Sequence, residues 1–162
     1  MASDTGKTAE HAHIEQIMQS RVLKNGIYKF LLSDVQITSA SKGEVVARLL
    51  LSENHINSQG GIHGSVSATI VDWIGGMAIA SWDFRNGTGV SVDIHVTYQS
   101  SAKVGEEIEI EGIGERVGGN LAFTKVGIYK VEDGKRGKIV ATGTHTKFVK
   151  GTEPKKVEAS TS

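Results

Sequence analysis

One acidic side chain interrupts the most apolar stretch of the chain. From Gly64 to Trp82 the only ionisable side chain is Asp72. The residues around it are apolar or small on every side rather than along one stripe, and this pattern predicts a helix that is buried all round. Because an unpartnered buried charge costs several kcal/mol, we expect Asp72 to be satisfied by a partner, kept protonated, or placed where it performs chemistry.

A glycine-rich segment leads into this predicted helix. Gly60, Gly61 and Gly64 surround His63. The first backbone N–H groups of a helix have no intrahelical acceptor, and the positive end of the helix dipole favours an oxyanion or a polarised carbonyl. The stretch therefore offers an electrophile-binding end near Gly64 and a candidate base at Asp72.

Length and composition limit the classes of function. The chain has 162 residues, a formal net charge of zero and no cysteine. This length suits a single domain, and the neutral charge argues against nucleic acid as a partner. Without cysteine there is no disulfide, thiolate metal site or cysteine nucleophile, which fits a reducing compartment. The histidine spacing also predicts no metal site.

The N-terminal stretch and the longest apolar run predict neither a targeting signal nor a membrane span. The N-terminus lacks an apolar signal segment, and Asp72 keeps the best apolar run below the roughly 18 residues that span a bilayer. We expect a soluble cytoplasmic protein, with the mitochondrion as the alternative location. We expect one folded domain over residues 9–150 and disorder over residues 1–8 and 151–162.

Periodicity predicts an α+β fold. Residues 9–24 have apolar residues at helical spacing, so we expect an amphipathic helix that ends at Asn25-Gly26. Runs rich in branched and aromatic residues predict strands at 27–38, 44–52, 90–98, 106–117, 120–131 and 138–149. A tight turn at Gly118-Gly119 and a looser loop at 133–137 would join the last three. These strands would form an antiparallel sheet wrapped around the one long central helix.

The strand predicted at 90–98 alternates cleanly. One face is apolar, and the other carries Ser91, Asp93, His95 and Thr97. We expect the apolar face to cover the central helix. The apolar residues of this strand are Val90, Val92, Ile94, Val96 and Tyr98.

An ordered set of short motifs extends over residues 25–149. The motifs are Asn57, Gly60, His63-Gly64, Asp72, Gly89 to Asp93, Thr97 to Glu106, Leu121 to Thr124, and Ala141 to Lys147. Together they resemble the hotdog-fold acyl-CoA thioesterases, in the branch that includes thioesterase superfamily member 2 and the phenylacetate-pathway thioesterases. The resemblance implies hydrolysis of acyl-CoA to a free acid and coenzyme A, in lipid metabolism. Ser65 and Ser101 depart from the glycine and proline usual there, which bears on pocket shape and substrate choice.

The resemblance also implies roles for individual residues. The Gly64 amide would polarise the thioester carbonyl, with Asn57 and His63 shaping its pocket, and Asp72 would activate water with help from Ser91. Whether Asp72 acts as base or nucleophile stays open. Coenzyme A, as part of the substrate, is the only cofactor-like group, and Lys103 and Arg116 would pair with its phosphates. Its predicted contacts are Tyr98, Ser100, Ser101, Lys103, Arg116, Gly118 and Gly119.

Helix geometry predicts a site shared between subunits. The nine positions from His63 to Asp72 turn a helix through about 900°, leaving the side chains on opposite faces and roughly 13 Å apart along the axis. We therefore expect a homodimer with shared sites, and the resemblance implies that dimers pair into a homotetramer.

Other interpretations stay open. The protein could be a hotdog hydratase or dehydratase, or a non-catalytic acyl-CoA binding protein. Asp72 could be a satisfied core carboxylate, Asn57 a turn residue, and Lys103 and Arg116 surface charges. His95 and His145 are expected to be exposed or hydrogen-bonded rather than catalytic.

Overall fold

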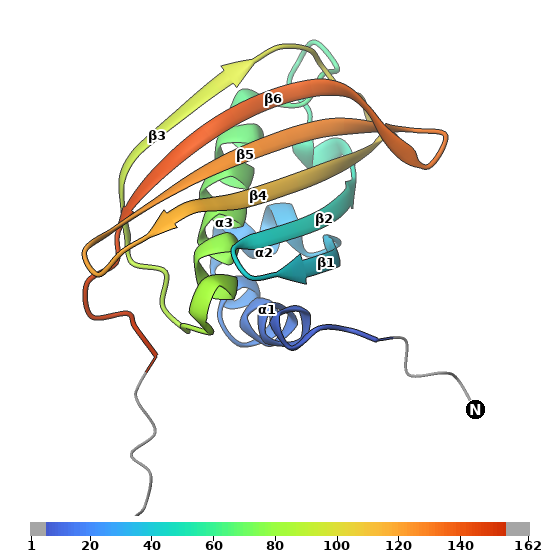
Figure 1. The fold of residues 1–162 in the computed structure, drawn as a ribbon. Helices are drawn as coiled ribbons and strands as arrows, with labels where there is room; N and C mark the ends of the chain where they lie inside the picture. Colours follow the sequence, from blue (N-terminus) through green and yellow to red (C-terminus); the bar gives the residue numbers. More distant parts are fainter. Residues whose placement is uncertain (1–5, 155–162) are drawn as a thin grey trace, which may run out of the picture.

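A six-stranded antiparallel sheet curves around one long helix, α3, in the computed structural model, which describes residues 6–154 (Figure 1). The strand order is β1-β2-β4-β5-β6-β3. The helices are α1 (Ala9–Ser20), α2 (Gly26–Leu32) and α3 (Gly64–Asp83), with 3-10 segments at Val22–Lys24 and Glu53–His55. The strands are β1 (Gln36–Ser41), β2 (Glu44–Leu50), β3 (Val90–Tyr98), β4 (Glu107–Val117), β5 (Leu121–Glu132) and β6 (Lys135–Phe148). The tails expected to be disordered lie mostly outside the described residues.

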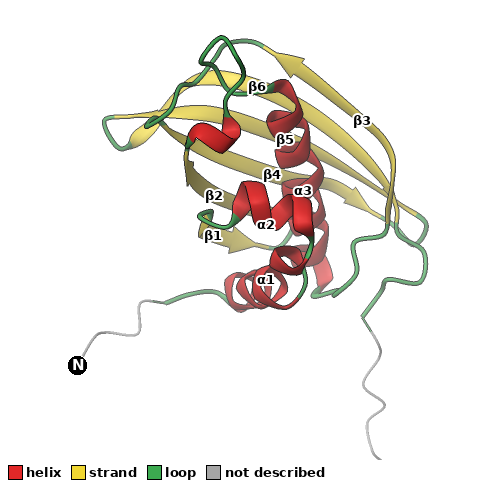
Figure 2. Ribbon diagram, turned by 180° about the vertical axis from the view of Figure 1, so that it is seen from behind, coloured by secondary structure: helices red, strands yellow, loops and turns green. Residues whose placement is uncertain are grey.

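The predicted central helix is confirmed as α3, which is buried on nearly all sides. The concave face of the sheet covers one side, and α1 and α2 cover part of the other (Figure 2). The approach to the sheet is close, since a Cβ at Gly112 would lie 2.7 Å from the backbone oxygen of Ile74. On the opposite side, Trp73 Nε1 donates to Met18 Sδ of α1 at 3.1 Å. No helix in the range 6–154 is long and apolar enough to span a membrane.

The prediction of a single strand over residues 27–38 is wrong in its first half. Residues Gly26–Leu32 form helix α2, and β1 begins only at Gln36. Asn25 caps this helix, because its Oδ1 accepts from the backbone N–H groups of Ile27 and Tyr28. In a short apolar run, periodicity alone does not distinguish a helical segment from a strand.

The connection between β5 and β6 is tighter than predicted. Asp133 and Gly134 form a two-residue turn with φ of 51° and 74°, which is the left-handed geometry of a hairpin turn. Glu132 pairs directly with Lys135. Strand β6 therefore starts at Lys135 rather than at residue 138.

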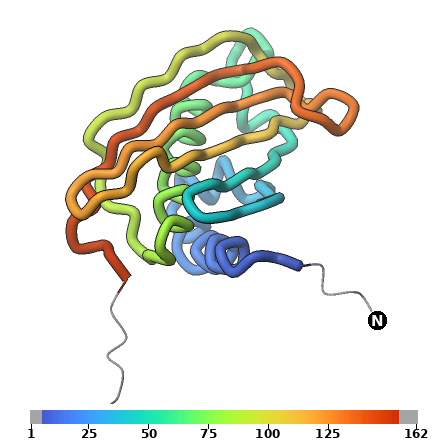
Figure 3. Tube along the Cα trace, in the orientation of Figure 1, coloured from blue at the N-terminus to red at the C-terminus, as the bar shows by residue number. Residues whose placement is uncertain are grey.

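Strand β3 differs most from its sequence pattern. It lies at the open edge of the sheet beside β6, reached by the loop that leaves α3 at Phe84 (Figure 3). A bulge between Ser91 and Asp93 shifts the alternation, so Ser91 faces α3 together with Ile94 and the residues that follow in register. The expected dry face is thus broken, and Val90 and Val92 remain 66% and 59% exposed.

Candidate active site

Asp72 lies near the middle of α3, where both carboxylate oxygens accept hydrogen bonds. The Tyr28 hydroxyl donates to Oδ2 from helix α2. The Ser91 hydroxyl donates to Oδ1 from β3 at 3.3 Å. The carboxylate side chain stays 28% exposed, so water can reach it. Of the options predicted for Asp72, the structure shows a partnered carboxylate that remains open to solvent.

His145 of β6 lies behind Ser91. Its Nε2 is 2.9 Å from Ser91 Oγ, and its Nδ1 has no hydrogen-bond partner in the described part of the chain. Burial, with the charge of Lys147, lowers the pKa of His145 to about 4, so the ring is neutral at pH 7. A buried N–H without an acceptor costs more than a buried lone pair, so we place the proton on Nε2. His145 then donates to Ser91, and Ser91 donates to Asp72.

Lys147 brings a positive charge to the same carboxylate. Its Nζ lies 3.9 Å from Asp72 Oδ1, and the side chain is almost fully buried. Burial lowers the pKa of Lys147, and the charge of Asp72 opposes that shift. The ammonium therefore lies within Coulombic reach of the carboxylate.

A pocket of about 200 Å³ opens beside Asp72. Its walls combine apolar side chains from α1 and α3 with polar groups from α2 and the loop before β3. The lining includes Ile17, Val22, Tyr28, Met77, Asn86, Thr88 and Lys147. The pocket is thus a small, mixed-polarity space next to a candidate base.

The second predicted cluster forms at the start of α3. His63 is the N-cap, and its Nδ1 accepts from the Ser65 N–H at 3.1 Å. Gly64 is the first helical residue, so its N–H has no intrahelical acceptor and is available to a ligand. Tyr98 of β3 donates to the Gly64 carbonyl oxygen at 3.0 Å. Asn57 Oδ1 accepts hydrogen bonds from the N–H groups of Gln59 and Gly61, so Asn57 stabilises the turn in this chain.

Within one chain these two clusters stay apart. Gly64 and Asp72 lie eight positions apart on one continuous helix, which corresponds to about 12 Å along the axis. One thioester carbonyl cannot contact both groups of the same chain.

The predicted coenzyme A contacts also divide into two groups. Tyr98, Ser100, Ser101 and Lys103 follow one another from the end of β3 into the next loop, where the Lys103 N–H donates to Glu106 Oε2 at 2.7 Å. Arg116, Gly118 and Gly119 lie at the far end of β4, beside a separate surface hollow. The length of β4 places these groups roughly 30 Å apart in one chain.

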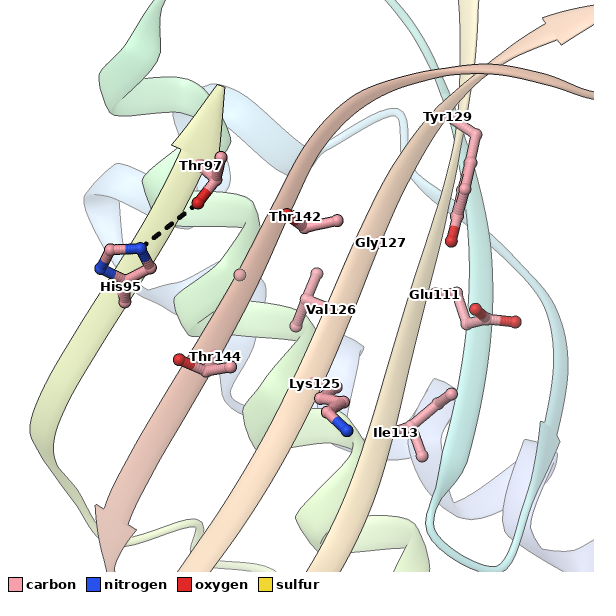
Figure 4. Close-up of a pocket in the computed structure, with 11 residues that line it drawn as sticks. His95, Thr97, Glu111, Ile113, Lys125, Val126, Gly127, Tyr129, Thr142 and Thr144 are labelled. Carbon is pink, nitrogen blue, oxygen red and sulfur yellow. Dashed lines mark hydrogen bonds between the residues drawn. The ribbon is translucent and has the colours of Figure 1, made fainter. Parts of the chain in front are cut away.

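A larger hollow, of about 420 Å³, lies on the outer face of the sheet (Figure 4). His95 and Thr97 line it, and they alternate with the β3 residues that face α3. The hollow is therefore on the opposite side of the sheet from Asp72. Across residues 6–154 there is no cluster of three or more potential metal-ligating acidic, histidine or cysteine side chains.

Sequence reasoning missed two groups around Asp72. Tyr28 was assigned to a strand, although Asn25-Gly26 just before it is also a helix-start signal. Lys147 ends the Ala141 to Lys147 motif, and nothing in the sequence places it beside Asp72. His145 is hydrogen-bonded, as expected, and it is buried.

The chain is similar in sequence and in fold to known proteins. A family model described as the thioesterase superfamily matches residues 59–137. The chain is 38% identical over 122 residues to human acyl-coenzyme A thioesterase 13, covering 75% of this chain and 84% of that protein. It is 34% identical over 151 residues to a putative esterase of Schizosaccharomyces pombe, covering 93% and 91%. The crystal structure of zebra fish thioesterase superfamily member 2 superposes with a TM-score of 0.71 at 36% identity, covering 85% of this chain and 93% of that one.

Proposed function

Since the chain belongs to the thioesterase superfamily and has its hotdog fold, we propose that it hydrolyses acyl-CoA to a free acid and coenzyme A. The observation that carries the proposal is the Asp72 carboxylate, held by hydrogen bonds from Tyr28 and Ser91 and still open to water beside a pocket. A protein that only binds acyl-CoA has no need of such a group in its central helix. The relatives named as acyl-coenzyme A thioesterases support the choice of substrate.

In the proposed reaction, Asp72 acts as a general base. It takes a proton from a water molecule as the water oxygen bonds to the thioester carbon. The Gly64 N–H of a second subunit, at the positive end of its α3, stabilises the oxyanion that forms on the carbonyl oxygen. The carbon–sulfur bond then breaks, and the proton held by Asp72 goes to the leaving thiolate. The scheme needs no metal and no cofactor beyond the substrate's own coenzyme A.

Ser91 and His145 would orient this base. The neutral His145 donates from Nε2 to Ser91 Oγ, which leaves the serine proton directed at Asp72 Oδ1. Because the pKa of His145 is about 4, this direction of donation holds across the neutral pH range. Lys147 adds a positive charge 3.9 Å from the same carboxylate oxygen.

We also propose that each site combines two subunits of a homodimer. Strand β3 is the unpaired edge of the sheet on the side nearest Asp72, and it exposes Val90, Val92 and Tyr98. Pairing of two β3 edges about a two-fold axis would cover these side chains. It would also bring the Gly64 end of one α3 toward Asp72 of the other. Such an approach is needed because Gly64 and Asp72 of the same chain are too far apart to act on one thioester.

The coenzyme A contacts fit the same dimer. Lys103 and Arg116 are both exposed but lie at opposite ends of β4 in one chain. We propose that one nucleotide is held by the Lys103 loop of one subunit and the Arg116 turn of another. We further propose that dimers pair into a tetramer and that residues 9–150 form a single folded domain. We also propose a cytoplasmic location and a role in lipid metabolism. The absence of cysteine from the sequence supports the location.

The decisive assay follows free thiol and the acyl double bond in parallel. Purified protein is incubated with straight-chain and aromatic acyl-CoAs and with an enoyl-CoA. We expect stoichiometric release of free thiol. Hydration of the enoyl-CoA without thiol release would identify a hydratase instead, and saturable binding without turnover of any substrate would identify a binding protein.

A further inference from the structure

Helix α2 places Tyr28 against the central helix. Asn25 starts α2 by accepting from the N–H groups of Ile27 and Tyr28, and Leu32 anchors its other end in the core. Tyr28 lies in the first turn of α2, and its ring forms part of the wall of the pocket beside Asp72. A short, capped helix holds this side chain in one place.

The Tyr28 hydroxyl completes the fixation of Asp72. It donates to Oδ2, whereas Ser91, His145 and Lys147 all approach Oδ1. Two donors on different oxygens fix both the position and the plane of a carboxylate. A single donor leaves the carboxylate free to rotate about the bond to its Cβ.

We propose that Tyr28 is a positioning residue for hydrolysis, which directs the Asp72 carboxylate toward the attacking water; this inference rests on the proposed function. Tyr28 does not contact the reacting atoms, so it acts through Asp72. Burial, followed by the contact with Asp72, raises the pKa of Tyr28 above its ordinary value. The hydroxyl therefore stays protonated and remains a donor throughout the working pH range.

Removing this hydroxyl takes away the donor that fixes Asp72 Oδ2. The carboxylate then loses its fixed orientation, and misplacement of a catalytic group slows the reaction. The expected result is slower turnover with nearly unchanged binding of the substrate.

The test compares Tyr28→Phe with Tyr129→Phe. Tyr129 is a partly exposed tyrosine on the sheet that stacks on Arg136, so its variant removes the same atom at a position away from Asp72. For Tyr28→Phe we expect kcat to fall roughly tenfold with KM within about twofold, the loss typical of one hydrogen bond to a charged group. Tyr129→Phe should match the wild type in both respects, and thermal melts should show that both variants are folded.

Asp72→Asn separates failure of this inference from failure of the proposed function. If Asp72→Asn is inactive while Tyr28→Phe keeps the wild-type kcat, Tyr28 does not position the base, and the inference is overturned. If Tyr28→Phe changes KM as strongly as it changes kcat, its role is only structural, and the inference is equally overturned. If folded Asp72→Asn stays active, the proposed mechanism itself fails.

Discussion

The Ser91 hydroxyl, on the edge strand β3, donates to Asp72 Oδ1 in the middle of α3 at 3.3 Å. This contact depends on the bulge between Ser91 and Asp93. In a regular strand Ser91 would point away from the face that carries Ile94 and Tyr98. The bulge thus links the geometry of the base to the same sheet edge that we propose for dimer formation.

The shared site predicts complementation between two inactive variants. Asp72→Asn and His63→Ala should each be inactive as homodimers, because each damages one half of both sites. After mixing and subunit exchange, half of the dimers would be mixed and would carry one intact site each, which restores roughly a quarter of the wild-type activity. Exchange is followed with a mass-tagged subunit. Complete exchange without recovery of thiol release would rule out a site built from two subunits.

The residues that we assign to coenzyme A should affect substrate binding rather than the rate of hydrolysis. Lys103→Ala and Arg116→Ala remove charges that we assign to the phosphates, so they should raise KM for acyl-CoA several-fold. The same variants should hydrolyse a short acyl-pantetheine thioester, which lacks the nucleotide, at the wild-type rate. Lys138→Ala removes another exposed lysine and serves as the control. Equal damage with both substrates would show that these residues are structural.

His145 should make the fold less stable in acid. Its pKa is about 4 in the folded chain, against an ordinary value of 6.5. Between these values the unfolded chain binds a proton at this position that the folded chain does not, so the free energy of unfolding falls as pH drops from about 6.5 to about 4. The contribution is up to about 3 kcal/mol.

Urea denaturation at pH 4.5, 5.5 and 7 measures this effect. The variant His145→Gln lacks the titrating group, so it should lose less stability than the wild type over that interval. The comparison removes the contribution of the other acidic groups, which both proteins share. Parallel pH profiles for the two proteins would contradict a buried neutral His145.

Part of this site could be predicted from the sequence. A lone carboxylate in an apolar helix was enough to single out Asp72, and the glycines around His63 predicted an open helix N-terminus at Gly64. Ser91 is expected beside Asp72 from the resemblance, whereas Tyr28 and Lys147 come from distant segments that no local pattern connects to Asp72. Tyr28 lies in a short apolar run whose pattern fits a strand as well as a helix, so its position beside Asp72 does not follow from the sequence.

The bulge in β3 could not be predicted either. The sequence from Val90 to Tyr98 alternates without a break, and nothing in it marks the extra residue at Val92. The bulge is seen only once β3 is paired with β6, where Ser91 lies opposite Lys147 and Asp93 lies opposite Thr146. Register between strands is a tertiary property, and a shift of one residue exchanges the two faces.

Thiol release by Asp72→Asn shows whether Asp72 is the base of an acyl-CoA thioesterase. Asparagine keeps the shape of the side chain but cannot accept a proton from water. We expect kcat to fall by roughly a hundredfold or more, with an unchanged melting temperature. Asp34→Asn, at an exposed position, should keep wild-type activity. A folded Asp72→Asn protein that releases thiol at the wild-type rate would show that Asp72 is not the base.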